Sequence, residues 1–252
     1  MKKTISIYGG GWVGAPLAFK LALADFDVRV SASSVHQQAA HPKIKVLDFR
    51  AEPDMPAENW SAINDSEVQI WAIPPRRKKN AEETYLAILQ DWVDNLPVGS
   101  AKKLIFLSST SVYANVSDTV DENSGINEDS LMAKAEAIVS SSKVPSVILR
   151  LAGLMGGDRY VAKYFSGKRN DGANCPINYV HKDDVVALIA LAAEKIDSGI
   201  YNTAFTAAGL DDDGLRPSGT TTITRPHMIN KPAITDTDFF TIYPSSEHVA
   251  PD

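Results

Sequence analysis

Three glycines near the N-terminus, Gly9, Gly11 and Gly14, have the spacing G-x-G-x-x-G within the stretch ISIYGGGWVGAPLA. A strand-like apolar run precedes them and an apolar helical run follows. The first glycine allows a tight turn, the second lets a pyrophosphate approach the backbone, and the third lets helix and strand pack closely. Amide groups at the helix start would bind the anion. The loop therefore predicts a dinucleotide site that includes Trp12 and Val13, although such turns also occur for purely steric reasons.

The segment that follows the second predicted strand, in VRVSASSVHQQ at residues 28–38, bears on the ribose of such a cofactor. An acidic residue there favours the free hydroxyls of NAD, and this segment has none. Ser33, Ser34 and His36 can hydrogen-bond to a 2′-phosphate, but no arginine follows them. The sequence therefore favours NADP slightly over NAD. Asp48, at the end of the run IKVLDF, either accepts from the adenine amino group or is a solvated acid after a strand.

Short apolar runs alternate with helical segments over the first four-fifths of the chain. The runs are TISIYG, DVRVSA, IKVLDF, VQIWAI, KLIFLSS and SVILRLAG. This alternation predicts βαβ units and a parallel sheet covered by helices on both faces. Residues 81–96 carry apolar side chains at helical spacing, and residues 183–195 predict another helix with Asp183 or Asp184 as its N-cap.

The predicted fold class is therefore α/β, a Rossmann-type doubly wound parallel sheet with a small C-terminal lobe. The run GIYNTA predicts a late strand, and from Thr206 onward the composition shifts to Asp, Thr, Pro and Gly. We predict a Rossmann domain at residues 1–151 plus 181–205. A small substrate-binding lobe is expected at residues 152–180 plus 206–252.

Composition limits the classes of partner. The 252 residues carry a formal net charge of -6, which argues against nucleic acid because such binding needs a basic face. The single cysteine, Cys175, cannot form an intrachain disulfide, so we expect a cytoplasmic protein. The apolar N-terminus is broken by glycines and Lys20, which argues against a signal peptide. No apolar run is long enough to span a membrane, and we expect a monomer or homodimer.

Four ordered motifs resemble those of the extended short-chain dehydrogenase/reductases, the family of NAD-dependent epimerases and dehydratases. LIFLSSTSVYA followed by DTVDENSG resembles the family's fifth strand and the acidic segment after it. ILRLAGLMGGDR, INYVHKDDVVALI and GIYNTA match three further motifs in the family's order. The resemblance covers about residues 4 to 204 and implies the fold and the cofactor described above.

The resemblance also implies catalytic positions. The family's hydroxyl that orients the substrate oxygen maps onto Ser109, with Thr110 beside it, although a hydroxyl there can also cap a strand end. The family's Y-x-x-x-K helix motif maps onto SLMAK, so Lys134 stands where the lysine binds the nicotinamide ribose. Ser130 occupies the tyrosine position, as in atypical members that keep the cofactor fold and lose that tyrosine.

The fourth strand departs from the family as well, because it ends in Pro74 and Pro75 where a small-residue motif is usual. We expect Ile73 and Pro74 to contact the cofactor. No metal site is predicted, since His181 has no His or Cys partner at ligand spacing. Two hypotheses follow. The first is an enzyme that transfers hydride between NAD(P) and a small-molecule substrate, either anionic or a sugar nucleotide, with an unidentified acid in place of the tyrosine. The second is a non-catalytic NAD(P)-binding redox sensor or scaffold.

Overall fold

A computed structural model describes residues 3–32, 41–76, 81–97, 99–113, 120–157, 159 and 177–207. Seven strands form one sheet in the order β3-β2-β1-β4-β5-β6-β9. The strands are β1 (Thr4–Tyr8), β2 (Asp27–Ala32), β3 (Ile44–Asp48), β4 (Val68–Trp71), β5 (Lys103–Ser109), β6 (Ser146–Leu151) and β9 (Gly199–Thr203). The pairs β1–β2, β1–β4, β2–β3 and β4–β5 are parallel. This strand order is that of the Rossmann fold, and the predicted fold class is confirmed.

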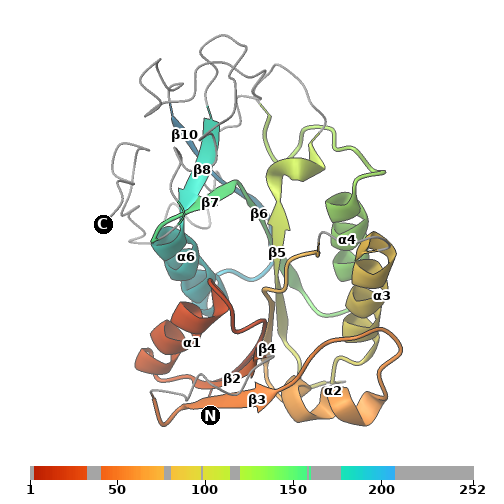
Figure 1. Ribbon diagram of the computed structural model, residues 1–252, viewed down its shortest axis with the longest axis vertical. Coiled ribbons are helices and arrows are strands. Elements are labelled where there is room, and N and C mark those ends of the chain that lie inside the picture. The colour runs from red at the N-terminus through yellow and green to blue at the C-terminus, as the bar shows by residue number, and fades with distance from the viewer. Residues whose placement is uncertain are drawn as a thin grey trace. The chain divides into compact units, whose positions relative to one another are not determined.

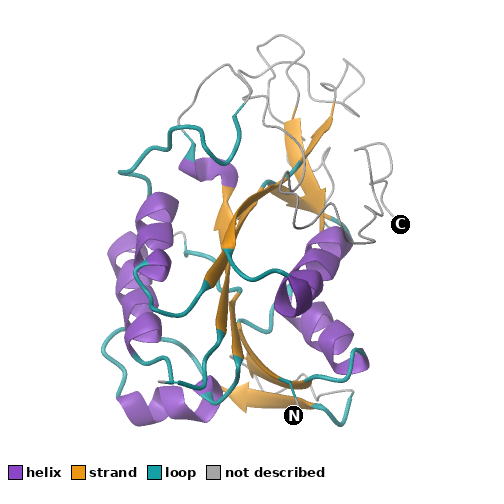
Figure 2. Cartoon of the chain, turned by 180° about the vertical axis from the view of Figure 1, so that it is seen from behind, coloured by secondary structure: helices purple, strands orange, loops and turns teal. Residues whose placement is uncertain are grey.

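Helices lie on both faces of the sheet (Figures 1 and 2). They are α1 (Gly14–Leu23), α2 (Ala57–Asn64), α3 (Ala81–Asp94), α4 (Leu131–Ser140) and α6 (Lys182–Lys195). In α3 the buried side chains are Tyr85, Leu89 and Trp92, at the spacing of one helical face. The expected N-cap of α6 is wrong by two or three residues, because the helix begins at Lys182 and Asp183 and Asp184 lie inside its first turn. Carboxylates are also favoured there by the helix dipole.

The chain divides into two compact units. Unit 1 comprises Met1–Ser108, Asp129–Ile148 and Val186–Gly199, and unit 2 comprises Ser109–Glu128, Leu149–Val185 and Ile200–Asp252. Unit 2 contains a second, three-stranded sheet of β7 (Gly153–Met155), β8 (Ile177–His181) and β10 (Phe205–Ala207). The domain bounds predicted from the sequence stay a prediction, because the units are defined by compactness and not by function.

An aromatic cluster fills the core of unit 1. Tyr8 stacks on Trp71 with ring centroids 5.5 Å apart and meets the edge of Trp92 at 5.6 Å. Phe49 and Trp60 extend the cluster, with their ring centroids 5.2 Å apart. All five side chains are buried, and burial raises the pKa of the Tyr8 phenol well above its usual range. The cluster joins the ends of β1 and β4 to α2 and α3.

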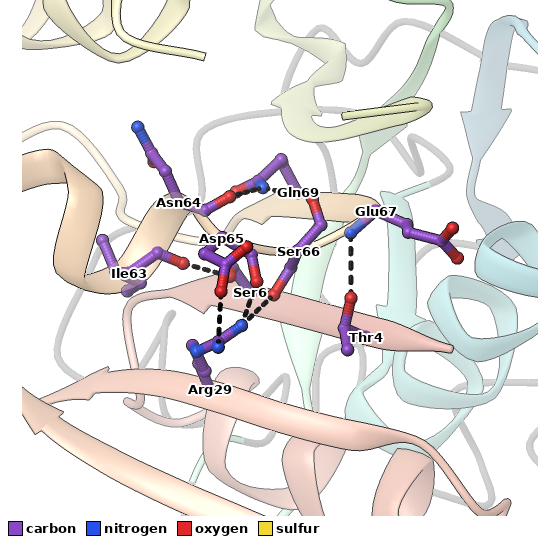
Figure 3. Close-up of polar contacts among 9 residues, drawn as sticks. All are labelled: Thr4, Ser6, Arg29, Ile63, Asn64, Asp65, Ser66, Glu67 and Gln69. Atoms are coloured by element: carbon purple, nitrogen blue, oxygen red, sulfur yellow. Dashed lines mark hydrogen bonds and ion pairs between the residues drawn. The ribbon is translucent and has the colours of Figure 1, made fainter. Parts of the chain in front are cut away.

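The turn between α2 and β4 is fastened to the first two strands (Figure 3). Arg29 on β2 donates to Ser66 Oγ over 2.9 Å and forms an ion pair with Asp65 at 3.0 Å. Thr4 Oγ1 on β1 accepts from the Glu67 amide at 3.1 Å. Gln69 Nε2 donates to the Ser66 carbonyl at 2.7 Å. These bonds fix the start of β4, whose other end lies beside the glycine loop.

Candidate functional site

The glycine loop lies between β1 and α1 and is anchored to β2. Gly9 has a φ of +103°, a conformation that side chains rarely adopt. Its amide donates to Ser31 Oγ over 2.8 Å, and the Gly10 amide donates to the Ser31 carbonyl over 2.6 Å. Sequence reasoning missed Ser31, because a serine inside an alternating strand carries no signal of what it binds.

The space around each glycine matches its predicted role. A Cβ atom on Gly14 would lie 2.0 Å from the Gly9 carbonyl oxygen, so helix and loop touch at that point. A Cβ on Gly11 would have no atom within 4 Å. The third glycine therefore permits close packing of α1, and the second leaves the backbone open to a ligand. This contrast is the geometry that a pyrophosphate site needs.

The start of α1 favours an anion. Its N-cap residue is Val13, which has no side-chain hydrogen bond to the helix, and the first turn contains no acidic residue. The amide groups and dipole of a helix N-terminus attract negative charge. Trp12 lies in the same loop and is partly exposed. The loop thus brings all five predicted residues of positions 9 to 14 to one end of the sheet.

Three further predicted cofactor residues of unit 1, Asp48, Ile73 and Pro74, lie at or just after the carboxyl ends of β3 and β4. Asp48 ends β3, is exposed, and is in register with Ala32 at the end of β2. Ile73 follows β4, and its Cγ1 would be 3.1 Å from a Cβ on Gly9. Pro74 is exposed beside it. Ser33, Ser34 and His36 lie outside the described residues, so the ribose assignment stays a prediction.

The SLMAK segment begins α4 instead of lying wholly within it. Ser130 is the N-cap, with an extended backbone, and its Oγ accepts from the Ala133 amide at 3.2 Å. Lys134 lies one turn later on the exposed side of the helix. Two residues further on, buried Glu136 accepts a 2.6 Å hydrogen bond from Ser108 Oγ. The hydroxyl at the tyrosine position therefore caps a helix, and its catalytic assignment stays a prediction.

Ser130→Ala is expected to lower the free energy of unfolding by about 1 kcal/mol, because the first turn of α4 loses its cap. Ser130→Asp supplies another capping oxygen and serves as the matched control, with stability close to that of the wild type. Urea denaturation of the three proteins provides the measurement. Equal stability of Ser130→Ala and wild type would contradict the capping role.

In unit 2, Ser109 and Thr110 lie at the end of β5 and the start of a single 3-10 turn, η1 (Thr110–Val112). Ser109 Oγ accepts from the Ser111 amide at 3.1 Å, and Thr110 is buried. The strand-capping alternative is therefore present for Ser109, and no observation tests the catalytic assignment of either hydroxyl.

A buried network holds this turn. Arg150 Nη1 donates to the Tyr113 hydroxyl at 2.8 Å, and that hydroxyl donates to Asn202 Oδ1 at 2.8 Å. The backbone N–H of Asn202 donates to Glu122 Oε1 at 2.8 Å. Burial raises the pKa of Tyr113, and its hydrogen bond from Arg150 partly offsets the rise. The four residues come from three of the four motifs that carry the family resemblance, because Tyr113 and Glu122 belong to the same motif.

That remaining motif supplies His181, which is also buried in unit 2. Its Nδ1 accepts from the Asp183 amide at 3.2 Å. A Cβ on Gly156 would lie 2.5 Å from His181 Nε2, and Gly156 has a φ of +120°. The imidazole therefore packs directly on a glycine of the GLMGGDR stretch.

Within the described ranges, no group of three or more His, Cys, Asp or Glu side chains can hold a metal ion. Over the same part of the chain, no helix has the length and apolarity needed to cross a membrane. Ser109 and Thr110 belong to unit 2, whereas Ser130, Lys134 and the glycine loop belong to unit 1.

Comparison with solved structures gives the class of fold. A protein of Methylobacillus flagellatus, provisionally assigned as a NAD-dependent epimerase/dehydratase, superposes with a TM-score of 0.70 at 21% identity over 98% of this chain and 96% of that one. MoeE5 in complex with UDP-glucose and NAD gives a TM-score of 0.73 at 14% identity, over 98% and 96% of the two chains. The fold is that of the NAD-dependent epimerases and dehydratases, as the motifs predict.

Sequence comparison is more specific. No protein-family model matches the chain. Protein YeeZ of Escherichia coli strain K12 is 32% identical over 210 residues, which are 79% of this chain and 77% of the relative. The chain therefore belongs to the family of Protein YeeZ.

Proposed function

We propose that the protein binds a nicotinamide dinucleotide at the glycine loop and acts on a small-molecule substrate of the sugar-nucleotide class. The observation that carries the proposal is the contrast between Gly14, where a Cβ would meet backbone at 2.0 Å, and Gly11, where nothing lies within 4 Å. MoeE5, which shares the fold, was solved with UDP-glucose and NAD. When bound, the dinucleotide would supply a hydride donor or acceptor.

The residues proposed to hold the cofactor come from the glycine loop, the end of β3 and helix α4. The glycine-loop backbone and the start of α1 would bind the pyrophosphate, and Asp48 would accept from the adenine amino group. Lys134 would bind the nicotinamide ribose. Ser109 and Thr110 would donate hydrogen bonds to the substrate oxygen, on a turn fixed by the Arg150 network. We keep NADP as slightly preferred to NAD, since residues 33–38 contain no acid.

A non-catalytic sensor or scaffold is the second candidate, favoured by Ser130. In the described structure this residue caps α4 with its hydroxyl, so no phenol stands one turn before Lys134 to act as general acid. Loss of a positioned general acid typically removes roughly 10²–10⁴-fold in rate. The two candidates share cofactor binding and differ in turnover.

The test is calorimetric titration of the wild-type protein with NADH and NADPH, followed by assays of UDP-sugars with the oxidised and the reduced form of each cofactor. We expect binding of both, with NADPH at least equal to NADH. Lys134→Ala should bind the cofactor more weakly and keep the stability of the wild type, because its side chain is exposed. Turnover of a UDP-sugar supports the enzyme, and binding without turnover supports the sensor. Failure to bind either dinucleotide would refute both.

A further inference from the structure

The exit of β4 is held by two side chains that donate to the same backbone oxygen. Trp71 Nε1 lies 3.1 Å from the Ile73 carbonyl oxygen, and the Tyr85 hydroxyl lies 3.2 Å from it. Trp71 is fully buried and Tyr85 nearly so. A carbonyl oxygen has two lone pairs, so two donors satisfy it and fix the orientation of its peptide group.

The side chain of Ile73 lies over the glycine loop. A Cβ on Gly9 would be 3.1 Å from Ile73 Cγ1 and equally close to the carbonyl carbon of Ala72. The Ala72 amide donates to the Tyr8 carbonyl at 2.8 Å, which ties the exits of β1 and β4 together. Ligands of doubly wound folds bind beyond the carboxyl ends of the strands. Ile73 therefore forms an apolar wall beside the first glycine of the loop.

The two donors are themselves rigidly supported. The Trp71 ring packs on Tyr8 and lies with its centroid 5.0 Å from that of Trp92. Trp92 and Tyr85 both belong to α3 and lie on its buried face. Burial raises the pKa of Tyr85 well above its usual range, with a smaller opposite effect from Trp71, so its hydroxyl stays protonated and able to donate.

We propose that Trp71 and Tyr85 are positioning residues for the dinucleotide. By fixing the Ile73 carbonyl they hold the Ile73 side chain against the glycine loop, and so set where the apolar wall of the cofactor site lies. The inference rests on the proposed function and deepens it. Neither donor touches the predicted pyrophosphate position, and their effect on binding passes through Ile73.

The test uses Tyr85→Phe, which keeps the ring and removes one of the two donors. NADH affinity, measured by calorimetry well below the melting temperature, is expected to fall by up to about tenfold, because the free energy of one hydrogen bond sets the upper limit of an effect that passes through Ile73. Tyr8→Phe is the matched control, because it removes another buried hydroxyl from the same cluster. That hydroxyl donates to Gln69 Oε1 at 3.0 Å and not to Ile73, so Tyr8→Phe should lose stability and keep its NADH affinity.

A double-mutant cycle with Ile73→Ala separates positioning from general loosening of the fold. Once the Ile73 side chain is shortened, Tyr85→Phe should produce no further loss of NADH affinity. Additive losses in the cycle, or an equal loss of affinity in Tyr8→Phe, would overturn the inference. If wild type binds NADH and Tyr85→Phe binds it equally well, the inference fails and the proposed function stands. If wild type binds neither NADH nor NADPH, both fail.

Discussion

Gly14→Ala is expected to abolish measurable NADH binding and to destabilise the protein. Alanine in place of glycine in a helix ordinarily gains up to about 1 kcal/mol. Here the added Cβ would lie 2.0 Å from the Gly9 carbonyl oxygen, a separation that backbone atoms cannot accept. Either α1 or the loop must move, and overpacking of this kind costs about 1–3 kcal/mol. Calorimetry with NADH and urea denaturation measure the two effects.

Gly11→Ala is the matched control in the same loop. Gly11 has no positive φ, and its Cβ would meet no atom within 4 Å. We therefore expect unchanged stability together with weaker NADH binding, since the methyl group would occupy the space left for the pyrophosphate. Wild-type NADH affinity in both Gly14→Ala and Gly11→Ala would show that the glycine loop is not part of the cofactor site.

The second large effect is expected for Arg150→Met, which should lower the free energy of unfolding by about 3 kcal/mol. The guanidinium donates to the buried Tyr113 hydroxyl and lies 5.0 Å from the centre of the Tyr113 ring. Methionine fills much of the same volume but donates no hydrogen bond. The loss therefore reports the charged hydrogen bond and the ring contact together.

Arg50→Met provides the comparison for Arg150→Met. Arg50 is exposed and forms a surface ion pair with Glu52 at 3.4 Å, a type of contact that contributes about 0–1 kcal/mol. Urea denaturation gives the free energy of unfolding of both variants, and a much larger loss in Arg150→Met would show that the Arg150 network stabilises the fold. A loss below about 1 kcal/mol in Arg150→Met would show that the network does not hold the turn that carries Ser109 and Thr110.

The sequence was sufficient for features whose physical cause is local. The spacing of Gly9, Gly11 and Gly14 predicts a tight loop before a closely packed helix, and in the structure Gly9 has a positive φ and Gly14 packs on the Gly9 carbonyl. The alternation of strands and helices likewise predicts the doubly wound sheet. The acidic residues at the start of α6 also predict the helix. Their assignment as the N-cap is wrong because a carboxylate is favoured at several positions of a first turn.

Features that depend on distant residues could not be predicted. The i, i+4 spacing of Ser130 and Lys134 does not tell where the helix begins, and the capping bond to the Ala133 amide became apparent only in three dimensions. Nothing in the sequence links Tyr113 to Arg150 or Asn202, which meet only after folding. The hydrogen bonds that Trp71 and Tyr85 donate to the Ile73 carbonyl could not be predicted either, because every residue has a backbone oxygen and its partners do not show in the sequence.

The four tryptophans differ in exposure, and this difference bears on the intrinsic fluorescence of the protein. Trp60, Trp71 and Trp92 are fully buried, whereas Trp12 is partly exposed in the glycine loop. The emission of a buried indole is insensitive to solvent, so three of the four contribute a constant, blue-shifted background. The remaining solvent-sensitive emission arises at Trp12, so we expect a ligand that binds at the loop, and that does not itself absorb tryptophan emission, to shift the spectrum of this residue.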